Sequence, residues 1–207
     1  MALYLDTETT GLHASGGDAI VELAIVDERG VALINTLVNP NRTIPWHASN
    51  VHGISDSMVR GMPDLNDLLP QIRKVISGQQ LVIYNAPFDV SFFPNRLREA
   101  SSVECAMRNF ASAIGGKSRK LGVAAAHVGH VWTGEAHRAL ADTLACKSVW
   151  NWLEAKKSKL KGHSSKSNIL QHEIITCRFC LKKLRIPSGK KLEVTCPLCQ
   201  GSFLYPS

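Results

Sequence analysis

Short apolar runs alternate with turn-forming residues over the first part of the chain. The runs occupy residues 2–6, 19–28 and 30–38, and glycines or charged residues separate them. Each run has the length of a β-strand, and the separators favour tight turns. A fourth run of this kind covers residues 80–85. The pattern therefore predicts the opening of a mixed sheet with hairpin links.

Leucine and isoleucine recur at helical spacing in later segments. Residues 63–78 predict a helix with Asp64 or Asn66 as the N-cap and Gly78 as the stop signal. The residues before it, rich in proline and asparagine, predict a loop. Further helices are predicted for residues 86–101, where Pro94 would kink the helix, for 103–116 after a short strand, for 120–129 and for 137–161.

Helical periodicity fades near residue 157, where small polar and basic residues become frequent. We therefore predict a first domain at residues 1–157, a basic linker at 158–172 and a small C-terminal domain at 173–207. A length of 207 residues with 44% hydrophobic content suffices for one ordinary core plus an appendage. The mixture of strands and helices predicts an α/β or α+β first domain.

The apolar runs are far too short to cross a bilayer, and the N-terminus lacks a basic region followed by an apolar one. We therefore expect a soluble cytoplasmic protein with no membrane partner.

The net charge of +7 is concentrated in the last quarter of the chain. Residues 1–150 carry 13 Lys and Arg against 14 Asp and Glu, whereas residues 151–207 carry 11 against 3. Such an excess favours a polyanionic partner such as nucleic acid, although charge of this kind can also serve solubility alone.

Four of the six cysteines form two pairs near the C-terminus. Cys177 and Cys180 are separated from Cys196 and Cys199 by residues 181–195, which is the spacing of a four-thiolate zinc site. We predict a zinc ribbon that binds one Zn²⁺, with the intervening residues forming a hairpin around residues 187–191. The alternatives are two disulfides, which suit exported proteins, or a rubredoxin-like iron centre.

Basic side chains accompany the cysteines. We expect the ribbon to bind nucleic acid through phosphate contacts that weaken as salt rises. The alternative is a ribbon that docks a protein partner, with lysines that serve solubility. The basic residues predicted to contact phosphates are Lys182, Lys183, Arg185, Lys190 and Lys191.

Acidic residues lie at the ends of two predicted strands. Asp6 and Glu8 are two apart on a strand, so their side chains project on one face. Two neighbouring carboxylates repel, and their burial is costly unless they share a cation. Asn85 and Asp89 follow the fourth strand and lie four apart on a helix face. Taken alone, each pair is also compatible with solvated acids or with ordinary helix capping.

His137 and Asp142 open the last predicted helix. They are five residues apart, about 140° around a helix, so they would not share a face if both were helical. A histidine on the entering loop, with Asp142 on the helix, would bring them together. Taken alone, this pair is also compatible with a helix-start histidine and a surface acid.

The three motifs together resemble those of the DEDDh group of the DnaQ-like 3′–5′ exonucleases. The resemblance covers about residues 2–155 and includes the segment Val51–Ser55, which is similar to a His-Gly-Ile segment in relatives such as exonuclease X and the proofreading subunit. Arg138 stands where the sister DEDDy group has tyrosine. The defining positions are Asp6, Glu8, Asp89, His137 and Asp142. This resemblance implies a ribonuclease H-like mixed sheet flanked by helices.

The resemblance also implies the chemistry. Two Mg²⁺ or Mn²⁺ ions would be bound by the four acids, with Asp6 bridging them. Glu8 and Asp142 would complete the ion that holds the nucleophilic water, Asp89 would act on the second ion, and His137 would be the general base. Hydrolysis would release nucleoside 5′-monophosphates one at a time from the 3′ end.

The resemblance further implies a pocket for the terminal nucleotide. Its expected members, with Asn85 added beside Asp89, are Thr7, Thr9, Leu12, Val51, His52, Asn85 and Phe88. Apolar positions of this kind also occur in ordinary cores. Tyr84, where some relatives have histidine, is a departure that would alter the surroundings of the acids. We expect DNA rather than RNA as substrate, preferably with single-stranded ends.

Three alternatives stay open at this point. The chain could be a proofreading or repair-associated exonuclease whose ribbon docks a protein, an RNA-processing exoribonuclease, or a binding module without catalysis.

Overall fold

The structure is a computed structural model that describes residues 2–117, 119–133, 137–164, 172–187 and 192–205. The chain divides into two compact units, Met1–Lys157 and Ser158–Ser207, which are considered separately. None of the helices within the described ranges combines the length and hydropathy needed to cross a membrane.

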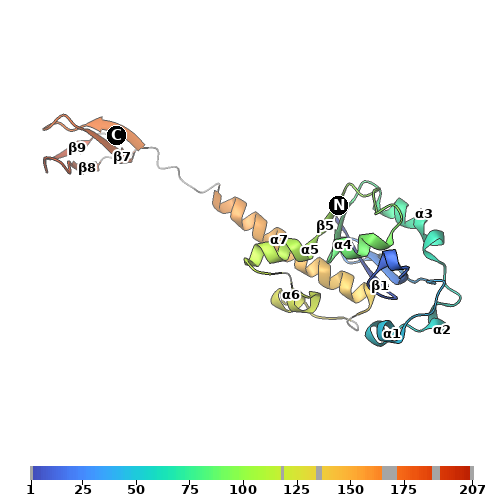
Figure 1. Cartoon of the computed structure of the whole chain (residues 1–207). Helices are drawn as coiled ribbons and strands as arrows, with labels where there is room; N and C mark the ends of the chain where they lie inside the picture. The colour runs from blue at the N-terminus through green and yellow to red at the C-terminus, as the bar shows by residue number, and fades with distance from the viewer. Residues whose placement is uncertain (1, 118, 134–136, 165–171, 188–191, 206–207) are drawn as a thin grey trace. The chain divides into compact units, whose positions relative to one another are not determined.

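A five-stranded mixed sheet forms the centre of the first unit (Figure 1). Its strand order is β3-β2-β1-β4-β5, in which β2 is antiparallel to β1 and β3, while β4 runs parallel to β1 and β5. The strands are β1 (Ala2–Thr9), β2 (Ile20–Val26), β3 (Ala32–Leu37), β4 (Gln80–Ile83) and β5 (Ser102–Cys105). The predicted mixed sheet is confirmed.

Helices cover both faces of this sheet. The α-helices are α1 (Trp46–His52), α2 (Asp56–Val59), α3 (Leu65–Ile76), α4 (Ala86–Asp89), α5 (Ala106–Ile114), α6 (Leu121–His127) and α7 (Ala139–Ser164). Two 3₁₀ turns, η1 (Ala14–Gly16) and η2 (Val90–Phe92), follow β1 and α4.

The alternation of β1 decides which face each of its side chains occupies. Leu3 and Leu5 belong to an apolar cluster with α3 and η2, whereas Tyr4 belongs to a second cluster with α5, α6 and α7. Because strand side chains alternate, Asp6 and Glu8 continue the face of Tyr4. The first turn of α7 supplies another acid to that same face.

The start of α3 confirms its predicted cap. The Asp64 carboxylate accepts the backbone N–H of Asp67, and the Asp67 carboxylate accepts the backbone N–H of Asp64, which forms a reciprocal capping box. The helix ends at Ile76, and Gly78 follows in the left-handed conformation with a φ of 68°. Glycine adopts this conformation without steric cost.

The helix predicted for residues 86–101 is much shorter than expected. Helical turns end at Phe92, and Phe93 is extended with a φ of −97° and a ψ of 129°. Proline disfavours the helical conformation of the residue before it, so Pro94 ends the helix rather than kinking it. Arg96 and Leu97 then adopt left-handed backbone conformations.

The predicted loop before α3 contains two short helices. Pro45 is the N-cap of α1, and Gly53 ends that helix with a φ of 70°. These helices pack Ala48, Ile54 and Val59 into a small apolar cluster. Their apolar positions were too few for their periodicity to be recognised.

The predicted linker is partly helical, because α7 continues to Ser164. Lysine and leucine favour helix, so the basic sequence loses its apolar face without losing its helical conformation. Residues 165–171 of the predicted linker lie outside the described residues.

After the end of α7, the described residues of the second unit form two hairpins, and their strand pairing corrects the hairpin predicted around residues 187–191. Strand β6 (His172–Thr176) pairs with β7 (Lys183–Pro187), and β8 (Leu192–Thr195) pairs with β9 (Ser202–Tyr205). Each Cys-x-x-Cys segment makes the turn of its own hairpin. The backbone N–H groups of Cys177 and Cys196 donate to the carbonyl oxygens of Lys182 and Gly201, respectively.

Candidate functional site

Three carboxylates from distant parts of the chain converge beside the sheet. Asp6 and Glu8 come from β1, and Asp142 comes from the first turn of α7. One oxygen from each of the three lies within 4.8 Å of the others. The predicted convergence of these residues is therefore present, and carboxylate oxygens are the ligands that hard divalent cations prefer.

Asp89, the fourth predicted acid, is buried at the end of α4. The Asn85 carbonyl accepts the backbone N–H groups of Phe88 and Asp89, and this turn places Asp89 after β4. The Thr7 hydroxyl donates to Asp89 Oδ1 at 2.7 Å. Asp89 lies outside the group of three converging oxygens, but its charge reaches Asp6 and helps to raise the pKa of that carboxyl.

The cluster is short of positive charge. Removal from water, reinforced by the neighbouring acids, raises the pKa of Asp6 well above its ordinary value and the pKa of Glu8 to about 8. Burial also raises the pKa of Asp89 to about 7 and that of Asp142 above its ordinary value. Such shifts mean that the ionised cluster lacks a compensating cation. The residues present therefore fit bound divalent metal.

His137 lies on the loop just before α7, as its spacing from Asp142 predicted. Its side chain is exposed, and its backbone is left-handed with a φ of 64°. Its backbone N–H donates to Asp142 Oδ1 at 3.3 Å, which ties the loop to the carboxylate cluster.

Glu22 and Arg138 belong to the same region but were missed as functional candidates. Glu22 lies on β2 directly opposite Glu8 and is only 4% exposed. Its carboxylate forms a salt bridge with Arg138 at 2.6 Å. A charged residue within the otherwise apolar strand Ile20–Val26 was the signal that could have identified it.

A cavity of about 470 Å³ lies next to the carboxylates. It contains most of the residues predicted to contact a nucleotide, but Asn85 is not among them. Its lining residues include Thr7, Glu8, Thr9, Gly11, Leu12, His47, Ala48, Val51, His52 and Phe88. A Cβ at Gly11 would lie 2.4 Å from the Asp18 carboxylate, so a larger residue there would displace that side chain.

His52 supports the cavity from within the protein. It is 4% exposed, and its Nδ1 accepts the backbone N–H of Ile54 at 3.0 Å. Burial lowers the pKa of the His52 ring. A buried ring with one nitrogen occupied differs from His137, which is exposed beside Asp142.

Tyr84 does not contribute a donor to the acids. Its hydroxyl donates to the backbone carbonyl of Arg119 at 2.6 Å, within the apolar cluster that includes α5 and α7. Tyr84, which stands where some relatives have histidine, therefore stabilises packing rather than supplying a hydrogen bond to the carboxylates.

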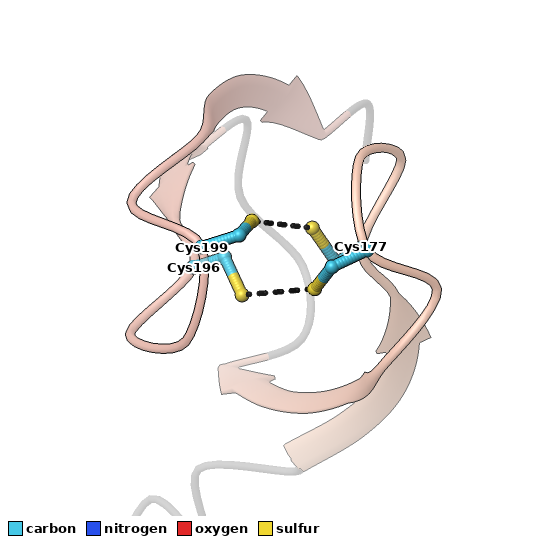
Figure 2. Close-up of side chains that lie close together, drawn as sticks. Cys177, Cys196 and Cys199 are labelled. Carbon is cyan, nitrogen blue, oxygen red and sulfur yellow. Dashed lines mark hydrogen bonds between the residues drawn. The ribbon is translucent and has the colours of Figure 1, made fainter.

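The four paired cysteines converge in the second unit, where Figure 2 shows two of their sulfur contacts as dashed lines. The Sγ atoms of Cys177 and Cys199 lie 3.7 Å apart, and those of Cys180 and Cys196 lie 3.6 Å apart. Disulfide sulfurs would lie about 2.05 Å apart, and all four thiols are free. A tetrahedron with Zn–S bonds of about 2.3 Å has edges of roughly 3.8 Å. The arrangement is that of a zinc ribbon.

Backbone amides stabilise the thiolate form of two of the cysteines, whereas removal from water and hydrogen bonds with the other thiols raise the pKa of Cys199 to about 12. Hydrogen bonds from the backbone of Cys199 and Leu198 lower the pKa of Cys196 to about 7. The backbone of Cys180 and Phe179 lowers the pKa of Cys177 in the same way. Thiolates are the metal-binding form of cysteine, so the turns prepare the cluster for a cation.

The basic residues of the C-terminal part of the sequence differ in how they are engaged. Lys182 and Lys183 are exposed, and Lys156 and Lys157 lie over the rings of Trp152 and Trp150. The side chain of Arg185 is not described, and Lys190 and Lys191 lie outside the described residues.

Residues 3–149 match the RNase_T family, which is described as exonuclease. The chain belongs to this exonuclease family. The matched range contains the four acids, His137, Glu22 and Arg138, whereas the cysteine unit lies beyond it.

Relatives of this exonuclease come from phage and bacteria. An uncharacterized exonuclease, CP81, of Escherichia phage 186 is 38% identical over 162 residues, which are 68% of this chain and 81% of the phage protein. The DNA polymerase III subunit epsilon of Rickettsia felis is 32% identical over 116 residues, 54% of this chain. That match spans 51% of the epsilon subunit, about half its length.

A solved structure agrees with these matches. Exonuclease X in complex with 5′ overhanging duplex DNA has a TM-score of 0.65 and 26% sequence identity. The match covers 76% of this chain and 93% of exonuclease X. The ribonuclease H-like fold implied by the sequence motifs is confirmed.

Proposed function

We propose that the protein is a metal-dependent 3′–5′ exonuclease of the DEDDh type that acts on DNA with single-stranded ends. The observation that carries this proposal is the convergence of Asp6, Glu8 and Asp142 within 4.8 Å, beside a cavity of about 470 Å³. Such a cavity can receive a nucleotide next to the acids.

Asp6, Glu8, Asp89 and Asp142 would hold two Mg²⁺ or Mn²⁺ ions. The raised pKa values of these carboxyls support this assignment, because each deprotonated acid needs a compensating cation. When bound, two ions supply charge stabilisation for the attacking and leaving oxygens of a phosphodiester.

His137 would act as the general base that takes a proton from the attacking water. Its exposed side chain and its backbone tie to Asp142 support that role. A neutral imidazole nitrogen accepts a proton, which is what a general base requires. We assign His52 a supporting role, because it is buried and its Nδ1 is occupied.

The terminal nucleotide would lie in the cavity with its base or sugar against apolar side chains. Leu12 and Val51 are exposed by 73% and 54%, and Phe88 lines the same cavity. Apolar contact and stacking tolerate every base. The Thr7 hydroxyl donates to Asp89 and thereby orients that acid beside the cavity. A DNA substrate is favoured by the likeness to epsilon subunits and to exonuclease X in its DNA complex.

The C-terminal unit would be a zinc ribbon that holds the substrate strand. The sulfur separations match a tetrahedral zinc site, and exposed Lys182 and Lys183 can contact phosphates. The exposed ring of Phe179, in the first cysteine turn, can stack on a base. A ribbon that docks a protein is the second candidate, and exposed Leu181 and Leu198 favour it.

The decisive experiment uses 5′-labelled single-stranded DNA, duplex DNA and RNA, each with Mg²⁺, Mn²⁺ or chelator. A ladder that shortens from the 3′ end on DNA only with metal is expected. Asp142→Asn is the control for contaminating nucleases. Shortening from the 5′ end would contradict the proposed polarity. Full activity in chelator would contradict metal dependence, and faster digestion of RNA than of DNA would contradict the proposed substrate.

The ribbon is tested by truncation after Ser164, which keeps α7 intact. Substrate affinity should fall and depend less on salt. If affinity and salt dependence are unchanged, the ribbon does not hold nucleic acid and the protein-docking candidate is favoured.

A further inference from the structure

Glu22 places a carboxylate on the active-site side of the sheet without joining the acid cluster. It lies directly opposite Glu8 in the antiparallel pairing of β1 and β2, so the two side chains project on the same face. Glu8 converges with Asp6 and Asp142, but Glu22 does not belong to that group. Its hydrogen bonds are directed instead to the start of α7.

The Glu22 carboxylate binds the two residues that follow His137. Arg138 Nη2 donates to Oε1 at 2.6 Å, and Arg138 Nε donates to Oε2 at 3.1 Å. The backbone N–H of Ala139 also donates to Oε2, at 2.9 Å. Ala139 is the first residue of α7 and is fully buried. A two-pronged guanidinium contact fixes orientation as well as distance.

His137 is thereby held from both sides. On one side its own N–H donates to Asp142, and on the other side Arg138 and Ala139 are bound to Glu22. The left-handed φ of 64° at His137 is uncommon for a residue with a Cβ. Such a conformation persists when its surroundings fix it, and the Glu22 contacts supply that restraint.

We propose that Glu22 and Arg138 are positioning residues that fix His137 for proton transfer. This inference rests on the proposed role of His137 as general base. Glu22 lies outside the group of converging carboxylates, although its charge is among those that raise the pKa of Asp6, Glu8 and Asp142. Its hydrogen bonds reach the backbone on which the imidazole is mounted. A misplacement of about 1 Å at a reacting group can reduce rate by roughly 10²-fold.

The test is a double-mutant cycle on the full chain with a 5′-labelled single-stranded oligonucleotide and saturating Mn²⁺. Glu22→Gln should lower kcat by roughly 10- to 100-fold while KM changes less than about twofold. In a His137→Ala background the same substitution should lower kcat less than about twofold, because the group that it positions is already absent. Equal losses in both backgrounds would overturn the proposal.

Arg138→Lys provides a variant that keeps Glu22 and the positive charge. Lysine cannot reproduce the two-pronged contact, so a loss of roughly tenfold is expected, again only when His137 is present. This variant tests the proposal if Glu22→Gln proves too unstable to assay. An Arg138→Lys enzyme with full activity would show that the guanidinium contact does not position His137.

Asp27→Asn is a matched control, because Asp27 directly follows β2, the strand that carries Glu22. Asp27 also accepts backbone and arginine hydrogen bonds, from Val31 and Arg29, but it has no link to His137. This control should leave kcat within about twofold of wild type. A comparable loss in Asp27→Asn would mean that any damage to the sheet slows the enzyme.

A second measurement does not depend on activity. The imidazole resonances of His137 in metal-free protein, identified by their absence in His137→Ala, should shift towards random-coil positions in Glu22→Gln and stay unchanged in Asp27→Asn. Unchanged resonances in Glu22→Gln would overturn the proposal even if the enzyme were slow. Full activity of His137→Ala would refute the general base itself, whereas a slow His137→Ala with a normal Glu22→Gln would refute only the positioning role.

Discussion

The carboxylate cluster of the first unit and the thiol cluster of the second unit differ in their relation to the apolar cores around them. Asp6 and Glu8 lie at the end of a strand whose neighbouring residues, Leu5 and Tyr4, are anchored in two large apolar clusters. Cys177 and Cys196, by contrast, are themselves fully buried members of the small cluster that constitutes the core of the second unit. The carboxylates adjoin a core, whereas the thiols form part of one.

This difference assigns opposite roles to metal in the two units. The sheet and its helices supply the folding free energy of the first unit, and its acids reduce that free energy when they are ionised without a cation. Among its described residues, the second unit has only the small apolar cluster that includes Cys177 and Cys196, so we expect metal binding to supply much of its folding free energy. Metal should therefore relieve repulsion in one unit and hold the other together.

Asp6→Asn should have the largest effect and should act in opposite directions on activity and stability. Loss of the carboxylate that we propose to bind both ions should lower hydrolysis by roughly 10³-fold or more, since several kcal/mol of charge stabilisation would be lost. The metal-free first unit should become more stable because one of the crowded charges is gone. Gel assays measure the activity, and tryptophan fluorescence measures unfolding in chelator.

Tryptophan fluorescence reports on the first unit alone, because all four tryptophans, Trp46, Trp132, Trp150 and Trp152, lie within residues 1–157. Asp27→Asn is the contrasting control. Hydrogen bonds from Val31 and Arg29 lower the pKa of Asp27, so this substitution should decrease stability. If Asp6→Asn also lowers the unfolding temperature in chelator, repulsion among the acids is not what limits the metal-free unit.

Cys196→Ser should unfold the second unit and leave the first one folded. A serine hydroxyl is a poor substitute for a thiolate, so the site should lose its zinc and with it the folding free energy of the ribbon. Metal analysis should show loss of zinc, and the NMR signals of β6 to β9 should lose their chemical-shift dispersion. Tryptophan unfolding should be unchanged.

The matched control for this variant is Cys105→Ser, which changes a thiol outside the cluster, where Cys105 Sγ contacts the Tyr84 carbonyl. It should retain zinc. A Cys196→Ser protein that keeps dispersed ribbon signals without zinc would remove the contrast between the two units.

The pH dependence of stability should reveal the repulsion in the first unit. Burial raises the pKa of Glu8 to about 8 and that of Asp89 to about 7. A carboxyl whose folded pKa is raised favours the folded state below its unfolded pKa, near 4, and loses that contribution as pH rises through the folded pKa. In chelator, the unfolding temperature should therefore fall between about pH 5 and pH 8.

Mn²⁺ should reverse this trend, because the ionised acids then bind cations, so its stabilising effect should be larger at pH 8 than at pH 5. Asp6→Asn should show a shallower fall in chelator. An unfolding temperature that rises from pH 5 to pH 8 in chelator would contradict the assignment of these acids as an uncompensated cluster.

Sequence patterns succeeded where function depends on local spacing. The two-residue interval places Asp6 and Glu8 on one face of β1, and the five-residue interval puts His137 on a loop before Asp142. The cysteine spacing likewise identified the four sulfurs that converge. Each of these relations is fixed by backbone geometry within a short segment.

Relations between distant segments were not predictable in this way. Glu22 and Arg138 are 116 residues apart, and Thr7 and Asp89 are 82 apart, so only the folded sheet brings each pair together. The ribbon hairpins were misassigned because residues 187–191 have turn-forming composition, whereas the cysteine segments close the turns that pair the strands. Composition alone does not show which strands of such a unit pair with each other.

Lys182→Gln should have the smallest effect and should refine the comparison, since it tests whether the ribbon serves the exonuclease unit directly. The exposed Lys182 side chain follows the first cysteine turn, and only its backbone carbonyl takes part in that turn, so the substitution should leave the zinc site intact. The logarithm of the association constant for single-stranded DNA falls linearly with the logarithm of the salt concentration. Loss of one phosphate contact should make the slope of this line shallower by about 0.7. Lys74→Gln, which removes an equal charge from an exposed position on α3, should not change that slope. Equal slopes for the two variants would mean that Lys182 acts only through net charge, and the ribbon would then contribute no phosphate contact at this position.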